Sequence, residues 1–216
     1  MRNTVGLLLT ISIIAISFAA IFVKWSEAPA TIISMYRMYF ASIFLLPLVW
    51  QYRYELTKIT KREWLFLSLA GLFLALHFAL WFESLKHTTV ASSTIILALQ
   101  PIIALIGGMI FYKERARIPM LITISISILG VTMIGWGDFG TENRMAIFGD
   151  VLSFFSVLAV VAYLLIGQNH VQKISHWIYS FSVFLIAGVV LNIYNFVSSI
   201  SLGPYPPREW GIFFLL

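Results

Sequence analysis

The chain has 216 residues, of which 60% are apolar and 11% are charged, with a formal net charge of +5 and no cysteine. Soluble domains typically hold about 25% charged residues, so a mean hydropathy of +0.93 excludes an ordinary water-soluble domain. The basic residues lie between apolar runs, which argues against a nucleic-acid partner, and the absence of cysteine excludes disulfides and thiolate chemistry.

Apolar runs close to 20 residues long follow one another along the chain, and about 20 residues are what an α-helix needs to cross a bilayer core. Seven runs are complete: 5–23, 31–50, 64–82, 90–112, 118–136, 147–166 and 177–197. The first follows Arg2 as in a signal peptide, but it lacks an Ala-x-Ala cleavage pattern and is interpreted as a retained helix. An eighth run begins at Trp210 and is too short to cross, so we expect it to continue beyond Leu216. The sequence predicts an all-α integral membrane protein whose partner is the lipid bilayer.

The charges of the connecting segments predict the orientation, because Lys and Arg are retained on the cytoplasmic side. The connections alternate between two sets. One holds nine basic residues: Arg2, Arg53, Lys58, Lys61, Arg62, Lys113, Arg115, Arg117 and Lys173. The other holds Lys24, Lys86, Arg144 and Arg208 beside Glu27, Asp138, Glu142, Asp150 and Glu209. We therefore predict a multi-pass protein of the cell membrane with a cytoplasmic amino terminus.

A short motif occurs twice, which is a sign of internal repetition. Arg62-Glu63-Trp64 opens the third run, and Arg208-Glu209-Trp210 opens the eighth, 146 residues later. Five crossings separate the copies, and an odd number reverses direction, so the repeats would have inverted topology. We expect a helical bundle of two inverted five-helix repeats: a first repeat over residues 1–137 and an incomplete second over 145–216, with about seven and a half of ten helices in this chain. Chance similarity in so biased a composition is the alternative.

Three polar residues lie inside the apolar runs, where a charged or polar group needs a partner or a cavity. Arg37 in the second run and His77 in the third are expected at similar depths, with Gln100 of the fourth run slightly deeper. We predict that these three residues and the neighbouring Trp81 bind a small-molecule substrate. The alternatives are an arginine that snorkels toward the surface and a histidine that only bonds neighbouring helices.

Pro101 and Glu83 are the candidate coupling or gating residues. Pro101 should weaken the helix and free a carbonyl group to line a cavity. Glu83 lies nearer the end of its helix, where it is expected to pair with Arg37 or with Lys86. An interfacial ion pair without a role in coupling is the alternative for Glu83.

Patterns for catalysis, metal ligation or nucleotide binding are not found in the sequence: it has no Ser-x-x-Lys, no paired catalytic carboxylates and no Walker A motif, and its four histidines are scattered. We therefore predict no enzymatic activity, no cofactor and no metal. A secondary carrier is the remaining class.

The sequence also resembles a known family. The residues that carry the resemblance are ALWFESLKHTTVA at 79–91, then Gln100-Pro101 and Tyr112-Lys113-Glu114-Arg115. A glycine-containing helix with Leu129-Gly130-Val131 follows, and Arg37 and Gly149-Asp150 also match family positions. In order and spacing these motifs resemble the EamA family of the drug/metabolite transporter (DMT) superfamily.

The resemblance implies a ten-helix carrier of two five-helix repeats, with a central cavity and alternating access, that usually exports small metabolites or drugs. It implies that Pro101 is the family's helix-four proline and that Glu114 is a cytoplasmic ion-pair residue. Coupling to protons is left open, as is a homodimer. The alternative function is a non-transporting membrane sensor or assembly subunit with a transporter-like bundle.

Overall fold

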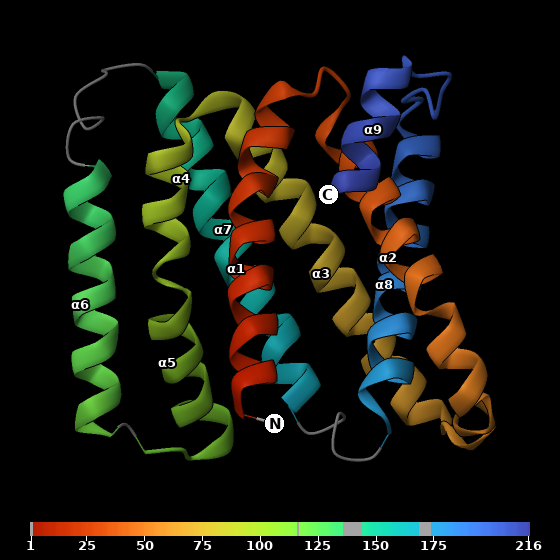
Figure 1. The fold of residues 1–216 in the computed structure, drawn as a ribbon, viewed down its shortest axis with the longest axis horizontal. Helices are drawn as coiled ribbons and strands as arrows, with labels where there is room; N and C mark the ends of the chain where they lie inside the picture. The colour runs from red at the N-terminus through yellow and green to blue at the C-terminus, as the bar shows by residue number, and fades with distance from the viewer. Residues whose placement is uncertain (1, 116, 136–143, 169–173) are drawn as a thin grey trace.

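The computed structural model describes residues 2–115, 117–135, 144–168 and 174–216, and all regular structure within them is helical. The helices run up and down beside one another (Figure 1). In chain order they are α1 (Arg2–Trp25), α2 (Ala30–Tyr52), the 3-10 helix η1 (Arg53–Lys58), α3 (Lys61–His87), α4 (Val90–Leu97), α5 (Gln100–Tyr112), α6 (Ile118–Gly135), α7 (Arg144–Gln168), α8 (His176–Val197) and α9 (Pro207–Leu215).

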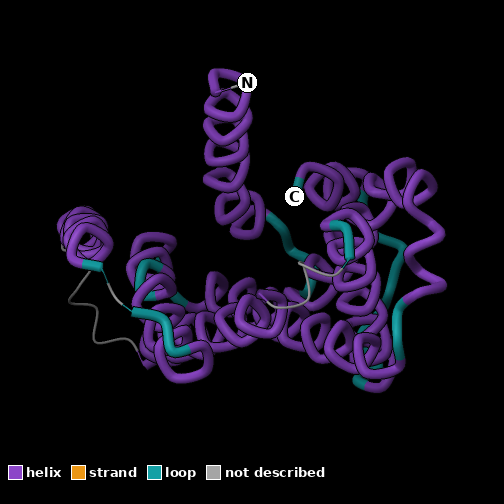
Figure 2. Tube along the Cα trace, turned by 90° about the horizontal axis from the view of Figure 1, so that it is seen from below, coloured by secondary structure: helices purple, strands orange, loops and turns teal. Residues whose placement is uncertain are grey.

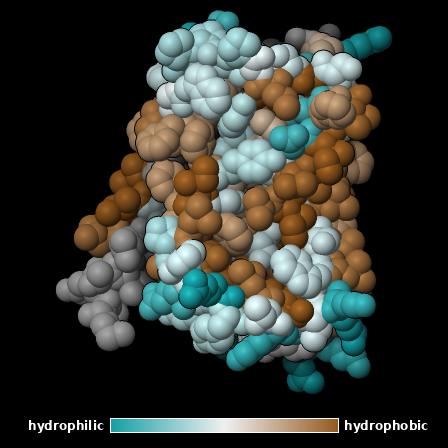
Figure 3. Space-filling view, turned by 90° about the vertical axis from the view of Figure 1, so that its right-hand side faces the viewer, coloured by the Kyte–Doolittle hydropathy of each residue, from teal (hydrophilic) through white to brown (hydrophobic). Residues whose placement is uncertain are grey.

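Five stretches of the described chain are long and apolar enough to cross a membrane: Ala30–Lys58, Lys61–His87, Val90–Tyr112, Arg144–Gln168 and His176–Val197. They confirm five of the predicted runs, and shorter apolar stretches of α1 and α6 coincide with the other two. On the face in Figure 3, hydrophobic residues spread across the middle and strongly hydrophilic ones gather toward the lower end. The predicted all-α membrane class is therefore confirmed.

The fourth predicted run is broken in the middle, as Pro101 led us to expect. The N–H groups of Ala98 and Leu99 bond to carbonyl groups three residues back, at 3.1 and 3.0 Å. Pro101 has no N–H to offer the carbonyl of Leu97, so the α-helical hydrogen bonding stops there. The run becomes α4 and α5, which together still form one candidate span.

The connections of α1 to α2, α3 to α4 and α8 to α9 lie at one end of the bundle, and those of α2 to α3 and α5 to α6 lie at the other (Figure 1). One end, here called the basic end, holds η1 and the connection between α5 and α6, with most of the predicted basic set. The other, here called the acidic end, holds Glu27 and Glu209, with Asp150 one and a half turns into α7. Lys173, Asp138 and Glu142 of the predicted sets lie outside the described residues. The side of the membrane on which each end lies stays a prediction.

The bundle is held mainly by α3 packed against α7 and α8, and by α2 packed against α8. These contacts bury Phe82, Leu67, Ile178 and Val183 almost completely. Helix α1 leans away from the other helices, as Figure 2 shows near the mark N. The α2, α3, α7 and α8 group therefore positions the polar residues described next.

Candidate functional site

Arg37 lies on α2 with its guanidinium group against two aromatic rings of α3. Its Cζ lies 4.6 Å from the ring centre of Phe78 and 5.7 Å from that of Phe82. Its Nη1 is buried and has no hydrogen-bond partner among the described residues. The side chain is therefore held between helices by its flat faces, while Nη1 has no acceptor within the described part of the chain.

His77 lies one residue before Phe78 and is buried between α3 and α7. Its Nδ1 lies 3.0 Å from both the carbonyl oxygen and the Oγ of Ser156. Its ring stacks on Trp81 with 5.8 Å between ring centres, and the ring of the next residue, Phe78, lies against the guanidinium group of Arg37. The expectation that Arg37 and His77 lie at similar depth is therefore met, with Trp81 beside them.

A row of buried serines continues from His77 along the contact between α3, α4 and α7. Ser153 donates to the Oγ of Ser84 at 2.8 Å, and it lies 2.9 Å from the Oγ of Ser93. Ser84 donates in turn to the carbonyl oxygen of Trp81 at 2.7 Å. The three serines are fully buried. Sequence reasoning missed them and Ser156, because serine in an apolar helix is also a common packing residue.

The row ends at Asp150, near the start of α7. One carboxylate oxygen of Asp150 accepts hydrogen bonds from the hydroxyls of Thr88 and Ser92, both at 2.7 Å. These contacts join α7 to Thr88, in the connection between α3 and α4, and to Ser92 of α4. The resemblance singled out Gly149-Asp150, but the partners of Asp150 become visible only in the fold.

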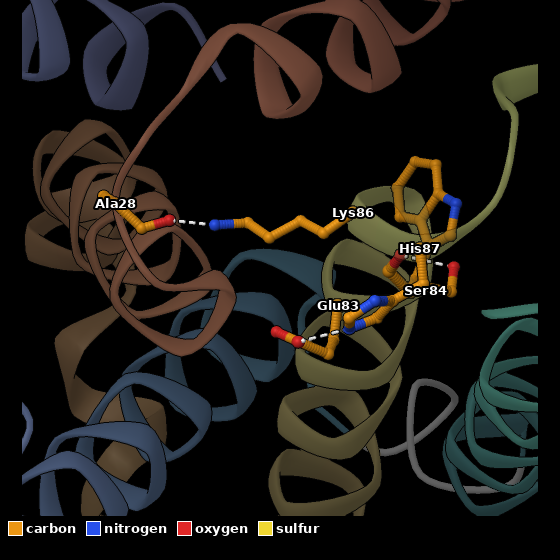
Figure 4. A network of polar contacts seen from close by, with 6 residues as sticks. Ala28, Glu83, Ser84, Lys86 and His87 are labelled. Atoms are coloured by element: carbon orange, nitrogen blue, oxygen red, sulfur yellow. Dashed lines mark hydrogen bonds and ion pairs between the residues drawn. The ribbon is translucent and has the colours of Figure 1, made fainter. Parts of the chain in front are cut away.

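Glu209, near the start of α9, closes a second set of contacts at the acidic end. It is 4% exposed. Its carboxylate accepts hydrogen bonds from the hydroxyl of Ser26 and, at 3.0 Å, from the N–H of Glu27. Lys86 donates to the carbonyl oxygen of Ala28 (Figure 4). The connection between α1 and α2 is thus tied to α3 and to α9.

Glu83 does not have the partner that was predicted. Its carboxylate pairs with Nε2 of His87 at 3.0 Å, while Lys86 bonds the backbone at Ala28 (Figure 4). The reason is that α3 continues to His87, five residues beyond the predicted end, so residues 83 and 87 face each other one turn apart. The expected pairing with Arg37 or Lys86 is therefore wrong, and a coupling role for Glu83 stays a prediction.

A cavity of about 1100 Å³ opens between α3, α5 and α7 on the side of the basic end. Thr60 and Arg62, at its edge, are exposed. Its walls are mostly apolar: Phe66, Ile103, Ile106, Gly107, Ile110, Phe111, Leu158, Val161, Ala162, Leu165 and Ile166, with Glu63 and Tyr112. The hydroxyl of Tyr112 donates to the carbonyl oxygen of Leu165 and so links two of the walls.

Phe66, on the wall of the cavity, and His77 lie on one face of α3. Phe66 and His77 are 11 residues apart, which is about three helical turns, so they lie on the same face of α3. Gln100 lies one turn before Ile103 at the start of α5. None of the polar contacts among the described residues joins Gln100 to Arg37 or His77. Its role in binding, like that of Pro101 in gating, stays a prediction.

Glu114 follows α5 at the basic end, where an ion pair was expected. Its carboxylate accepts a hydrogen bond of 2.6 Å from the Nε2 of Gln168. The partner is thus a neutral amide, because the end of α7 lies beside this connection. Among the described residues, no three His, Asp or Glu side chains gather as metal ligands.

Comparisons with known proteins identify the family of this chain. The model of the EamA-like transporter family matches residues 4–136, which is more than half of the chain. A protein named "Uncharacterized transporter YxxF", from Bacillus subtilis (strain 168), is 25% identical over 164 residues, which cover 75% of this chain and 52% of that protein. The chain thus spans about half the length of this curated relative. The family match places this chain in the EamA-like transporter family.

Proposed function

We propose that the protein is a secondary transporter that exports small organic metabolites or drugs by alternating access. The observation that carries the proposal is the open cavity of about 1100 Å³ lined by residues of three candidate membrane spans, Lys61–His87, Val90–Tyr112 and Arg144–Gln168. Small-molecule sites are typically apolar clefts of about 300–1000 Å³ with a few polar groups. A cavity of this size inside a bundle of a transporter family supports solute passage.

In this proposal the solute enters at the basic end and moves along α3 toward His77, Trp81 and Arg37. Gln100 lies on this route, beyond the end of the cavity that is nearer the acidic end. Pro101 and Glu83 take part in gating or coupling. The amino terminus lies in the cytoplasm and the protein resides in the plasma membrane, so the cavity opens to the cytoplasm, as export requires. Proton coupling and a homodimer are parts of the proposal that need their own tests.

Solute flux tests the proposal directly. The full-length protein is reconstituted in lipid vesicles, and uptake of a panel of small metabolites and drugs is compared with protein-free vesicles, with and without a pH gradient. Flux of at least one solute above the protein-free rate is expected, and a dependence on the gradient would establish proton coupling. Absence of flux for every solute, from protein that is folded, would contradict the proposal and favour a sensor or assembly subunit.

A further inference from the structure

Arg37 is a partly buried cation whose positive charge is not matched within the described part of the chain. Its contacts there are with the rings of Phe78 and Phe82, and Nη1 lies buried without a hydrogen-bond acceptor. It stands 7 residues into α2, about 10 Å from the end of the helix by helical rise. A cation at that depth inside a membrane bundle is expected to meet an anion.

The described acidic side chains do not supply that anion. Six of them accept hydrogen bonds from other groups: Glu55 from Ser175, Glu63 from Thr60, Glu83 from His87, Glu114 from Gln168, Asp150 from Thr88 and Ser92, and Glu209 from Ser26 and Glu27. Glu27 is exposed on the connection between α1 and α2. The positive charge of Arg37 is therefore left for another molecule or another part of the protein.

The surroundings of Arg37 suit a particular chemistry. A guanidinium group presents a planar set of N–H donors that matches the two oxygens of a carboxylate. The aromatic rings lie against its flat faces, and its Nη1 donor has no acceptor among the described residues. Phe78 and Trp81 are only partly buried, and their ring centres lie 6.3 Å apart, so they add apolar surface close to Arg37. A solute with an apolar body and one carboxylate group would satisfy both features.

We propose that Arg37 binds the carboxylate of the solute, so that the substrates of this protein are organic carboxylates with an apolar body. This inference rests on the proposed transport function, because it names the class of solute that is carried. Arg37 lies too deep to bind a lipid headgroup, because headgroups remain at the membrane surface, about 10 Å away along α2.

Binding in detergent tests this inference without requiring transport. The thermal stability of the full-length protein is measured with millimolar aromatic and aliphatic carboxylates, including benzoate and indole-3-acetate, each beside its primary amide of the same shape. At least one carboxylate is expected to raise the Tm while its amide does not. Arg37→Gln should weaken that binding about tenfold or more, because a charged hydrogen-bonded contact is lost, and Arg37→Lys should restore part of it.

Arg53→Gln is the matched control, because Arg53 also stacks on an aromatic ring, Trp50 at 4.5 Å, but is exposed at the basic end. It should leave carboxylate binding unchanged. If Arg37→Gln does not fold, Arg37→Lys replaces it as the test variant, and its affinity for the carboxylate should be measurably lower than that of the wild type. Equal stabilisation by carboxylates and amides in the wild type, or a preference that survives in both Arg37 variants, would overturn the inference. Absence of flux despite carboxylate binding would instead contradict only the transport function.

Discussion

At the acidic end, carboxylates and hydroxyls are hydrogen-bonded between helices, whereas toward the basic end α3, α5 and α7 stand apart around a cavity with mostly apolar walls. The same two helices, α3 and α7, take part in both regions. Near Ser84 and Ser153 they touch through paired polar groups, and near Phe66 and Ala162 they enclose open space.

This difference shows how one pair of helices can be closed at one end and open at the other. Buried hydrogen bonds need close and directed contact, so they fix the helices at the acidic end. Apolar walls make no such demand, so the helices can separate there and line a space that a solute could fill. The following predictions test the contrast by loosening the closed end and filling the open one.

Substitution of Gly149 by Leu should have the largest effect. A Cβ at this position would lie 2.8 Å from the backbone nitrogen of Thr88 and 3.0 Å from the carbonyl oxygen of Ser84. Because these are backbone atoms, α7 would have to move away from α3, at a cost of about 3 kcal/mol. Unfolding in detergent measures the loss. Gly211→Leu is the control, since its Cβ would meet nothing within 4 Å; an equal loss in both variants would contradict close contact at Gly149.

Glu209→Gln should have the next largest effect. The carboxylate is buried and accepts two hydrogen bonds from the connection between α1 and α2. An amide of the same shape carries no charge and offers one acceptor oxygen in place of two, so we expect a loss of about 2 kcal/mol in unfolding free energy. Glu27→Gln, at the neighbouring exposed acid, should change the unfolding free energy by less than about 0.5 kcal/mol. If the two variants are equally stable, the buried carboxylate does not hold the acidic end.

Ala162→Trp tests the open region. Ala162 lines the cavity, so an indole should occupy part of the space that the solute needs, and flux should fall about tenfold, equivalent to about 1.4 kcal/mol. Unfolding free energy should change little, because the ring enters existing space. Leu164→Trp is the control two residues away, at a side chain that is 41% exposed and does not line the cavity. Equal flux in both variants would place the solute route elsewhere.

The sequence was sufficient for the features that depend on composition and local chemistry. Runs of about 20 apolar residues predicted the spans, Pro101 predicted the break before α5, and the positions of Arg37 and His77 in neighbouring helices predicted a similar depth, which agrees with the place of Arg37 against Phe78. Sequence reasoning failed where the contact partner of a side chain depends on the length or rotation of its helix. Glu83 pairs with His87 because α3 is longer than its apolar run, and the burial of Glu209 depends on how α9 packs.

The buried serines show why such contacts escape sequence reasoning, and Ser153 provides their test. Its hydroxyl lies between those of Ser84 and Ser93, and removing it leaves two buried groups with fewer partners. Ser153→Ala should therefore cost about 1 kcal/mol in unfolding free energy. Ser17→Ala removes an exposed hydroxyl that bonds only its own helix, at Ile13, and should cost less than about 0.5 kcal/mol. A larger loss at Ser17 than at Ser153 would mean that the serine row fills space between helices without holding them together.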